Sequence, residues 1–177
     1  MPIIKIYPSK RPVRGILQYI TRGDTVPEEL IRTNGCDILD AEQEFSDIAR
    51  YYNKPTGAGN RTYYHMIVSY NTTYEKISPE EVRDMVKDLC QRTKIDCYQW
   101  YLAVHTDRPD HMHAHVVINN VSYRGDRKQH VKAGKSFQST GKLRHELMEK
   151  GNVICKEHGY EHSLVNTKSK AQERLTR

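Results

Sequence analysis

Long apolar runs are missing from this 177-residue sequence. No segment approaches the roughly 20 consecutive apolar residues that a membrane-spanning helix needs. The first ten residues, MPIIKIYPSK, also lack the apolar core of a secretory signal. We therefore expect a cytoplasmic protein that has no membrane partner.

Cysteine is scarce, and its spacing excludes two common kinds of site. The four cysteines are Cys36, Cys90, Cys97 and Cys155, and no two of them form a CxxC pair. Zinc knuckles and thioredoxin-like redox motifs both need such a pair. Four free thiols are therefore expected in a chain of this kind.

Acidic residues are absent from the first 22 positions, which carry five basic residues. A second basic segment lies at 124–150, with eight basic residues against three acidic ones, and the formal net charge of the chain is +6. Such segregated positive charge suits a surface that binds the phosphates of nucleic acid. A solvated basic face would have the same composition, so charge alone leaves both readings open.

Apolar periodicity predicts an α+β fold, in which helices pack on an antiparallel sheet. Strands are predicted at residues 3–7, 63–70, 98–105 and 113–121, and helices at 12–20, 40–52, 78–94 and 137–158. Residues 23–39 are predicted to form a long loop, and residues 124–136 a basic mobile loop or hairpin. We expect one domain over residues 1–160, followed by a basic tail or linker at 161–177.

The segment HTDRPDHMHAHVVINN contains four histidines within eleven residues. In a strand at 113–121, alternation places His113 and His115 on one face, with α-carbons about 6.6 Å apart, so both imidazoles can reach one cation. Including His111 would extend the set to about 13 Å, which is too far for one ion. The third ligand should therefore come from the preceding strand, which ends at His105. Asp107 is placed to accept the free N–H of a ligand histidine.

The stretch HMHAHVVIN resembles the HUH motif, in which two histidines flank a hydrophobic residue, of the HUH endonucleases. Together with the preceding H-T-D, it is similar to the third motif of conjugative relaxases of the mobilization-nuclease family (VirD2/MobA-like, MOBP type). GILQYITRGD at 15–24 is similar to the first motif of that family, and TYYHMIVSYN at 62–71 to the second. The resemblance covers most of the chain but only the N-terminal nicking domain of those longer proteins.

The resemblance implies a set of roles for individual residues. Tyr19 matches the nucleophile, and Asp107 matches the acid of the third motif. His105, His113 and His115 match the three metal ligands. The expected fold is the HUH-endonuclease fold, a central antiparallel sheet with a ferredoxin- or RRM-like palm. The residues expected to contact DNA are Arg14, Arg22, Ser69, Asn119, Arg124, Arg127, Lys128 and Lys132.

The same resemblance implies a metal-dependent, site- and strand-specific nick at an origin of transfer, with a 5′-phosphotyrosine adduct that can be religated. The expected partners are single-stranded or hairpin origin DNA, accessory relaxosome proteins and a coupling protein, and the enzyme is expected to be a monomer. Three imidazoles suit Mn, Zn or Ni better than Mg. The family is described as using Mg or Mn, so the identity of the divalent ion stays open.

Three other functions fit part of the sequence. A replication-initiator type of HUH endonuclease would use paired tyrosines, for which Tyr51 and Tyr52 are the candidates. A zinc hydrolase with three histidine ligands explains the metal site but not the basic segments. A non-catalytic DNA-binding module with a structural metal would need a fourth protein ligand.

Overall fold

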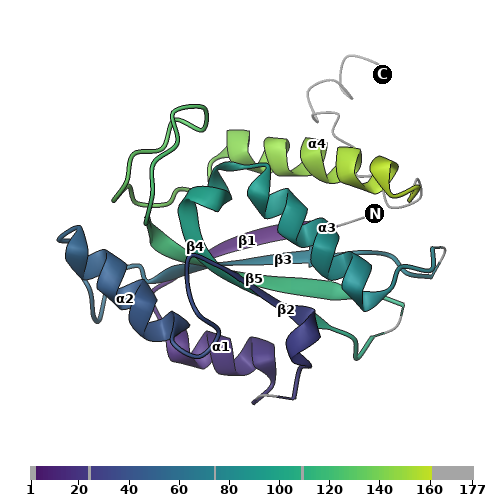
Figure 1. Ribbon diagram of the computed structural model, residues 1–177, viewed down its shortest axis with the longest axis horizontal. Helices are drawn as coiled ribbons and strands as arrows, with labels where there is room; N and C mark the ends of the chain where they lie inside the picture. Colours follow the sequence, from purple (N-terminus) through teal and green to yellow (C-terminus); the bar gives the residue numbers. More distant parts are fainter. Residues whose placement is uncertain (1–2, 24, 74, 109, 161–177) are drawn as a thin grey trace.

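The computed structural model describes residues 3–23, 25–73, 75–108 and 110–160 (Figure 1). Over these residues, five strands form one antiparallel sheet in the order β1-β3-β5-β4-β2, flanked by four helices. The strands are β1 Ile3–Ser9, β2 Ile31–Asn34, β3 Tyr63–Ser69, β4 Tyr98–His105 and β5 His113–Ser122, and the helices are α1 Val13–Thr21, α2 Ala41–Tyr51, α3 Pro79–Gln91 and α4 Gly141–Glu157. The predicted α+β class with a central antiparallel sheet is confirmed. The predicted tail at 161–177 lies outside the described residues.

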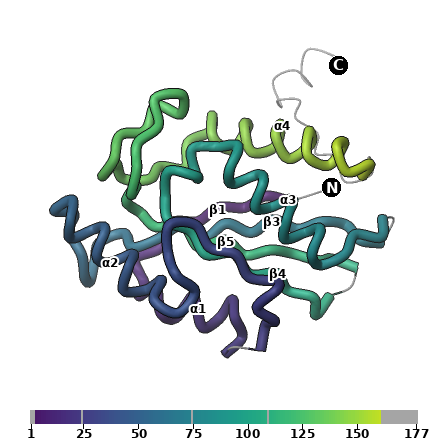
Figure 2. The backbone as a smooth tube through the Cα atoms, in the orientation of Figure 1, coloured from purple at the N-terminus to yellow at the C-terminus, as the bar shows by residue number. Residues whose placement is uncertain are grey.

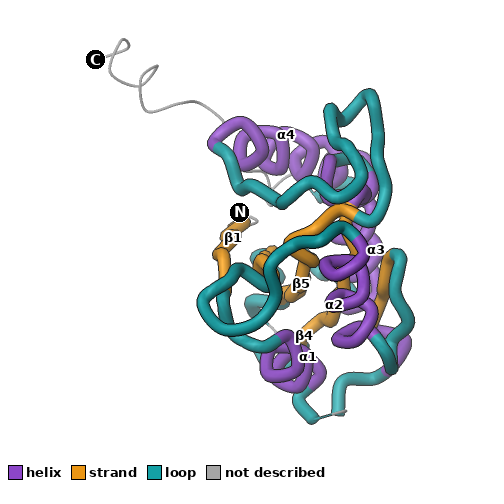
Figure 3. Tube along the Cα trace, turned by 90° about the vertical axis from the view of Figure 1, so that its left-hand side faces the viewer, coloured by secondary structure: helices purple, strands orange, loops and turns teal. Residues whose placement is uncertain are grey.

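The helices cover the sheet from both sides, with α3 and α4 on one face and α1 and α2 on the other (Figures 1 and 3). Alternation along β5 explains how one strand serves both layers. Ala114 and Val116 belong to the larger core under α3 and α4, whereas Val117 belongs to the smaller core under α1 and α2. Every residue of β4 is buried, because helices lie on both of its sides.

Helix α1 is amphipathic, and this property decides which of its side chains are buried and which are exposed. Val13 and Ile20 are buried against the smaller core, while Tyr19 on the flank of the helix is 59% exposed. The helix ends at Thr21, and the next residue, Arg22, has left-handed backbone angles (φ 51°). The backbone N–H of this capping residue donates to the carbonyl of Tyr19 (3.2 Å).

Helix α3 begins as the sequence predicts. The Ser78 hydroxyl accepts from the backbone N–H of Glu81 (3.2 Å), and the Glu81 carboxylate accepts from the backbone N–H of Ser78 (2.8 Å). This capping box satisfies two N–H groups that the first turn of a helix leaves without partners. Asp40, by contrast, precedes α2 without a capping hydrogen bond from its side chain.

The prediction of a long loop at 23–39 is wrong in part. Residues Glu28–Leu30 form a 3-10 turn, and Ile31–Asn34 form strand β2, which pairs with β4 at the edge of the sheet. Only Ile31 in this short strand is apolar, and turn-forming residues surround it. The strand forms because it pairs with the buried β4, and its own residue pattern does not predict it.

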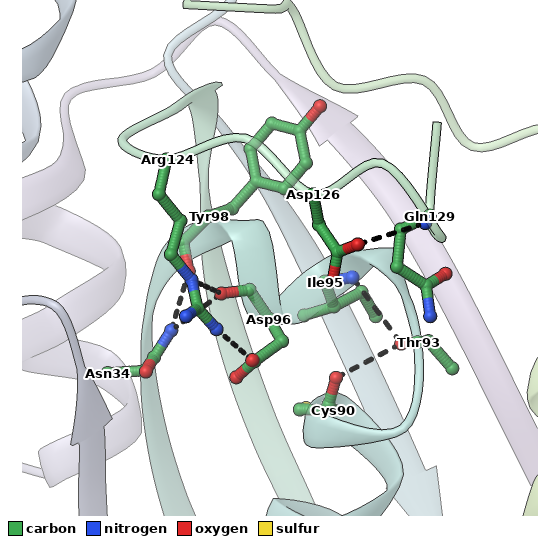
Figure 4. Close-up of polar contacts among 9 residues, drawn as sticks. All are labelled: Asn34, Cys90, Thr93, Ile95, Asp96, Tyr98, Arg124, Asp126 and Gln129. Atoms are coloured by element: carbon green, nitrogen blue, oxygen red, sulfur yellow. Dashed lines mark hydrogen bonds and ion pairs between the residues drawn. The ribbon is translucent and has the colours of Figure 1, made fainter. Parts of the chain in front are cut away.

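Residues 124–136 form a hairpin, with a bridge between Asp126 and Val131. Figure 4 shows how its base is fixed: the guanidinium of Arg124 pairs with the carboxylate of Asp96 and donates to the Asp96 carbonyl (3.1 Å). At the other end, Gly134 has φ 77° and lies against the ring of Tyr52, where a Cβ atom would come within 2.5 Å. The hairpin is therefore attached to the body of the domain on both sides.

The path of the backbone can be followed in Figure 2, where the hairpin and α4 close the upper side of the sheet. Among the described helices, none combines the length and the apolar character needed to cross a bilayer.

Candidate active site

Three histidines meet where β4 ends and β5 begins. His105 lies directly opposite His113 in the antiparallel register, and His115 lies opposite Ala103. One nitrogen from each of the three rings lies within 4.8 Å of the others. His105 and His115 are each only 2% exposed, and His113 is half-buried. The turn between the two strands thus brings together the three histidines that the spacing selects, and the exposed His111 stays outside the cluster.

Backbone carbonyls fix which nitrogen two of these rings present. Nε2 of His105 lies 2.7 Å from the carbonyl oxygen of Ile20, and Nδ1 of His113 lies 3.2 Å from that of His111. A carbonyl only accepts, so each of these nitrogens carries the proton and donates. The nitrogens left with a lone pair are therefore His105 Nδ1 and His113 Nε2, and a guanidinium nitrogen of Arg22 lies 3.3 Å from His105 Nδ1.

The third ring is held by another histidine, His65 on β3. Nε2 of His65 lies 2.8 Å from Nδ1 of His115, and the two rings stack with centroids 5.0 Å apart. Among the described residues, no partner reaches the buried Nε2 of His115. A polar atom left in this state is costly unless a ligand satisfies it. Together with the two neighbouring lone pairs, this orphaned nitrogen fits a bound cation.

Sequence reasoning did not select His65. It lies in the strand that resembles the second motif, and the strand parity places it on the same face as Ser69. Only the pairing of β3 with β5, which sets His65 opposite Val117, brings it beside His115. The register between strands distant in sequence is not readable from a single chain.

Lowered pKa values in the histidine cluster favour binding of a cation. Burial lowers the pKa of His115 to about 2, with further repulsion from His105 and His65, and burial with repulsion from His105 lowers the pKa of His65 to about 4. Burial also lowers the pKa of His105. The imidazoles of His65, His105 and His115 are therefore neutral near pH 7, and neutral nitrogen is the form that binds a metal.

A stability test follows from these shifts. The folded pKa of His115 lies below its usual value, so the unfolded chain binds more protons once the pH falls below about 6.5. Stability that is complete above that pH should decline by about 1.4 kcal/mol per pH unit for His115 as the pH falls toward 5. Denaturant unfolding in EDTA measures the slope, and His115→Asn should flatten it. His145→Asn, on the exposed surface of α4, is the matched control, and equal slopes for wild type, His115→Asn and His145→Asn would contradict the assignment.

Tyr19 lies at the open side of the histidine cluster. Its ring makes edge contacts with His115 (centroids 5.6 Å apart) and with His105 (6.1 Å). Helix α1 holds it there because Ile20, the next residue, is fully buried and supplies the carbonyl that fixes His105. One exposed hydroxyl-bearing ring thus lies beside the imidazoles of His105 and His115.

Asp107 does not hold a histidine, contrary to the sequence prediction. Its carboxylate pairs with Arg22 (2.9 Å), and a guanidinium nitrogen of Arg22 lies 3.3 Å from Nδ1 of His105. Hydrogen bonding to Arg22 keeps the pKa of Asp107 below its usual value. The N–H of His105 is already taken by Ile20, so the carboxylate positions an arginine at the rim of the cluster instead.

The other residues expected to contact DNA fall into separate groups. Ser69 lies opposite His113 in the sheet, and Arg14 is exposed on α1. Asn119 is 2% exposed, and its amide donates to the carbonyl of Phe45 (3.2 Å) and to Gln99 (2.8 Å). The side chain of Asn119 is therefore committed to the core, although it shares a strand face with the histidines.

The basic hairpin lies far from the histidines. It follows the last residue of β5, whereas His113 is the first, and ten residues of strand extend about 30 Å. Arg127, Lys128 and Lys132 are exposed there, while Arg124 is paired with Asp96. A cavity of about 340 Å³ beside the hairpin is lined by Lys94, Lys128, Lys135 and Lys142, among others.

This geometry disfavours the replication-initiator type of HUH endonuclease and the non-catalytic module with a structural metal. Tyr51 and Tyr52 contact each other at the end of α2, and Tyr52 packs on the hairpin. Within the described part of the chain, the group that can hold a metal has three members rather than four. A closed structural zinc site takes four protein ligands, whereas three ligands leave a position open for substrate.

Comparison with known proteins connects this geometry to a family. The sequence model of a family described as "Relaxase: MobA/VirD2-like, nuclease domain" matches residues 19–160. The fold is similar to a solved chain described as "Molecular Basis of Vancomycin Resistance Transfer in Staphylococcus aureus", with a TM-score of 0.64, 10% identity and coverage of 96% of this chain and 99% of that one.

Curated relatives include two proteins called "Protein rlx" from Staphylococcus aureus. One is 29% identical over 124 residues, which cover 70% of this chain and 35% of the relative, and the other is 26% identical over 141 residues, which cover 80% and 37%. The chain thus spans about a third of the length of the curated relatives it matches. On the match to the family model, the chain belongs to the MobA/VirD2-like relaxase family, as part of its nuclease domain.

Proposed function

We propose that this domain nicks one strand of DNA at an origin of transfer and becomes covalently joined to the 5′ end through Tyr19. The observation that supports this most directly is the contact between the exposed Tyr19 ring and two of three converging histidines. A nucleophile and an open cation site within one contact distance are what a transesterification needs.

His105, His113 and His115 would hold a divalent cation through the three lone pairs described above. Bound there, the ion would act as a Lewis acid toward a phosphate oxygen. Nitrogen ligands favour Mn, Zn or Ni, whereas the family is described as using Mg or Mn. The protein's own contribution is to orient the rings through Ile20, His111 and His65 before any ion arrives.

The chemical step exchanges one phosphoester for another. The Tyr19 oxygen attacks phosphorus, the bond from phosphorus to the 3′ oxygen breaks, and the phenolic proton ends on the 3′-hydroxyl. The phosphodiester energy is kept in the tyrosine ester, so the reverse reaction can reseal the strand. Arg22, held at the rim by Asp107, supplies positive charge beside the reacting phosphate.

The substrate is expected to contact the domain at two distant places. Single-stranded DNA would enter at Tyr19, with Arg14, Arg22 and Ser69 nearby. The exposed basic residues of the hairpin, Arg127, Lys128 and Lys132, would contact backbone phosphates farther along, for instance in a hairpin stem of the origin. Accessory relaxosome proteins and a coupling protein are the expected protein partners.

A covalent-capture experiment tests the proposal without knowledge of the origin sequence. The protein is mixed with Mn²⁺ and a random-sequence library of single-stranded DNA, denatured, washed and sequenced for attached strands. We expect capture of strands that share one sequence at their 5′ ends. A protein that captures no strand under any divalent ion would contradict the proposed activity.

A smaller effect is expected at His65, which does not touch the cation. Nε2 of His115 can bind a cation only if its proton is on Nδ1, and Nδ1–H then donates to Nε2 of His65. His65→Ala should therefore weaken Mn²⁺ or Zn²⁺ affinity by about 10–100-fold, the usual cost of removing an outer-shell partner. Titration calorimetry measures the affinity, and ¹⁵N NMR reports the tautomer of His115.

The conservative variant His65→Gln separates positioning from general damage. A glutamine carbonyl can accept the same N–H, so His65→Gln should recover part of the affinity and the Nδ1–H tautomer. If both variants bind the ion as wild type does, His65 does not position His115.

A further inference from the structure

Within the described residues, no helix packs over part of the sheet face that carries the histidines. Three rows of residues cross this face. The rows are Ile3–Ser69–His113, Lys5–Ile67–His115 and Tyr7–His65–Val117, each read from β1 through β3 to β5. Helices α1 and α2 pack over β4 and β5, and their core takes only Tyr63 from β3 and nothing from β1. We call the β1 and β3 members of these rows the open face: Ile3, Lys5, Tyr7, His65, Ile67 and Ser69.

We propose that the open face binds the single-stranded DNA adjoining the nicked phosphate, with Tyr7 stacking on a base and Lys5 contacting a backbone phosphate. This inference rests on the proposed function, because it names where that substrate lies. The occupant is a single strand rather than a duplex, since bases must be unpaired to stack on a side chain.

Exposed apolar side chains gather on this side of the sheet. Six large apolar or aromatic residues are conspicuously exposed in the described chain, and three of them, Ile3 (52%), Tyr7 (49%) and Tyr19 (59%), lie on this side of the sheet. On β1 the neighbouring residues behave differently, because Ile6 is buried and Ile4 packs near Gly151 of α4. On β1, the side chains toward α4 are thus covered, whereas Ile3 and Tyr7 on the histidine side are exposed.

The open face is continuous with the reacting centre. Tyr7 is the register partner of His65, and His65 hydrogen-bonds His115. Lys5 is two strands from His115, which is about 10 Å at the usual strand spacing. A strand whose phosphate lies at Tyr19 and the histidines would pass directly onto these residues.

The side chains of the open face have the chemistry that binds a single strand. An exposed aromatic ring next to a lysine is the combination that binds single strands, because every base has a face that can stack and every nucleotide has a phosphate. Residues 1–22 contain no acid to oppose this.

The experiment measures binding of a fluorescein-labelled oligothymidylate by anisotropy in EDTA, over a range of salt concentrations. Tyr7→Ala should weaken binding about tenfold, and Tyr7→Phe should keep most of the affinity because the ring remains. Lys5→Ala should reduce the slope of log affinity against log salt by about 0.7, the value for one phosphate on a single strand. Tyr7→Ala should leave that slope unchanged.

Matched controls are Tyr51→Ala, which removes an exposed tyrosine from α2, and Lys156→Ala, which removes an exposed lysine from α4. Both should bind as wild type does. Wild-type affinity of Tyr7→Ala, or an equal loss in Tyr51→Ala, would overturn the proposal. Because EDTA removes the cation, a protein that binds here but never forms an adduct with Mn²⁺ would refute the nicking activity and not the open face.

Discussion

Replacing Tyr19 with phenylalanine is expected to abolish the covalent DNA adduct and leave the fold and the cation site intact. The phenylalanine ring can keep the edge contacts with His105 and His115, because those contacts involve the ring and not the hydroxyl. Tyr19 is 59% exposed, so losing its hydroxyl removes no buried hydrogen bond from the core. What disappears is the oxygen that forms the new phosphoester.

The expected loss is large, because removing a nucleophile from an assembled site commonly costs at least about 10⁴-fold in rate. Adduct formation is measured on denaturing gels with a strand recovered by covalent capture. Tyr51→Phe is the matched control, since it changes another exposed tyrosine away from the cluster, and it should form the adduct at the wild-type rate. An adduct that persists in Tyr19→Phe would assign the nucleophile to another residue.

The fold was largely predictable where the local pattern and the tertiary environment agree. The β4–β5 hairpin and the Ser78 capping box follow from alternation and from capping chemistry over a few residues. Strand β2 was missed because a single isoleucine in four residues gives no periodic signal. Its existence depends on β4, more than 60 residues later.

The candidate site was likewise predictable in part: its three central histidines were, and the residues around them were not. The spacing of His105, His113 and His115 was enough to select them and to exclude His111, because a strand has a fixed rise per residue. The outer contacts were not predictable, since they depend on partners from other elements. Arg22 reaches Asp107 from the end of α1, and His65 reaches His115 from β3.

Strand parity also misleads when it is the only information. Asn119 shares its parity with His113 and His115, yet helix α2 covers it and its amide bonds to Phe45 and Gln99. Arg124 belongs to a basic segment, but its guanidinium pairs with Asp96. Which basic or polar residues remain free to meet DNA is decided by their neighbours in space.

The cation site can be tested independently of any DNA. His113→Ala and His115→Ala each reduce three converging nitrogens to two. Each should therefore lower Mn²⁺ or Zn²⁺ affinity by a larger factor than His65→Ala, for which a loss of about 10–100-fold is expected. His111→Ala is the matched control, because His111 is exposed and contributes only its backbone carbonyl to the cluster. Its metal content should equal that of the wild type.

Thermal unfolding gives a second measure of the same site. An ion present at 100 times its dissociation constant stabilises the folded protein by about 2.7 kcal/mol. For a domain of this size, that corresponds to a rise in Tm of about 5–10 °C. We expect this rise for wild type and His111→Ala and its absence for His115→Ala. His115→Ala also removes a buried imidazole whose Nε2 has no hydrogen-bond partner among the described residues, so the metal-free protein should lose less stability than the volume removed would suggest. A rise in Tm that survives in both His113→Ala and His115→Ala would place the cation elsewhere and remove the basis for the three-histidine site.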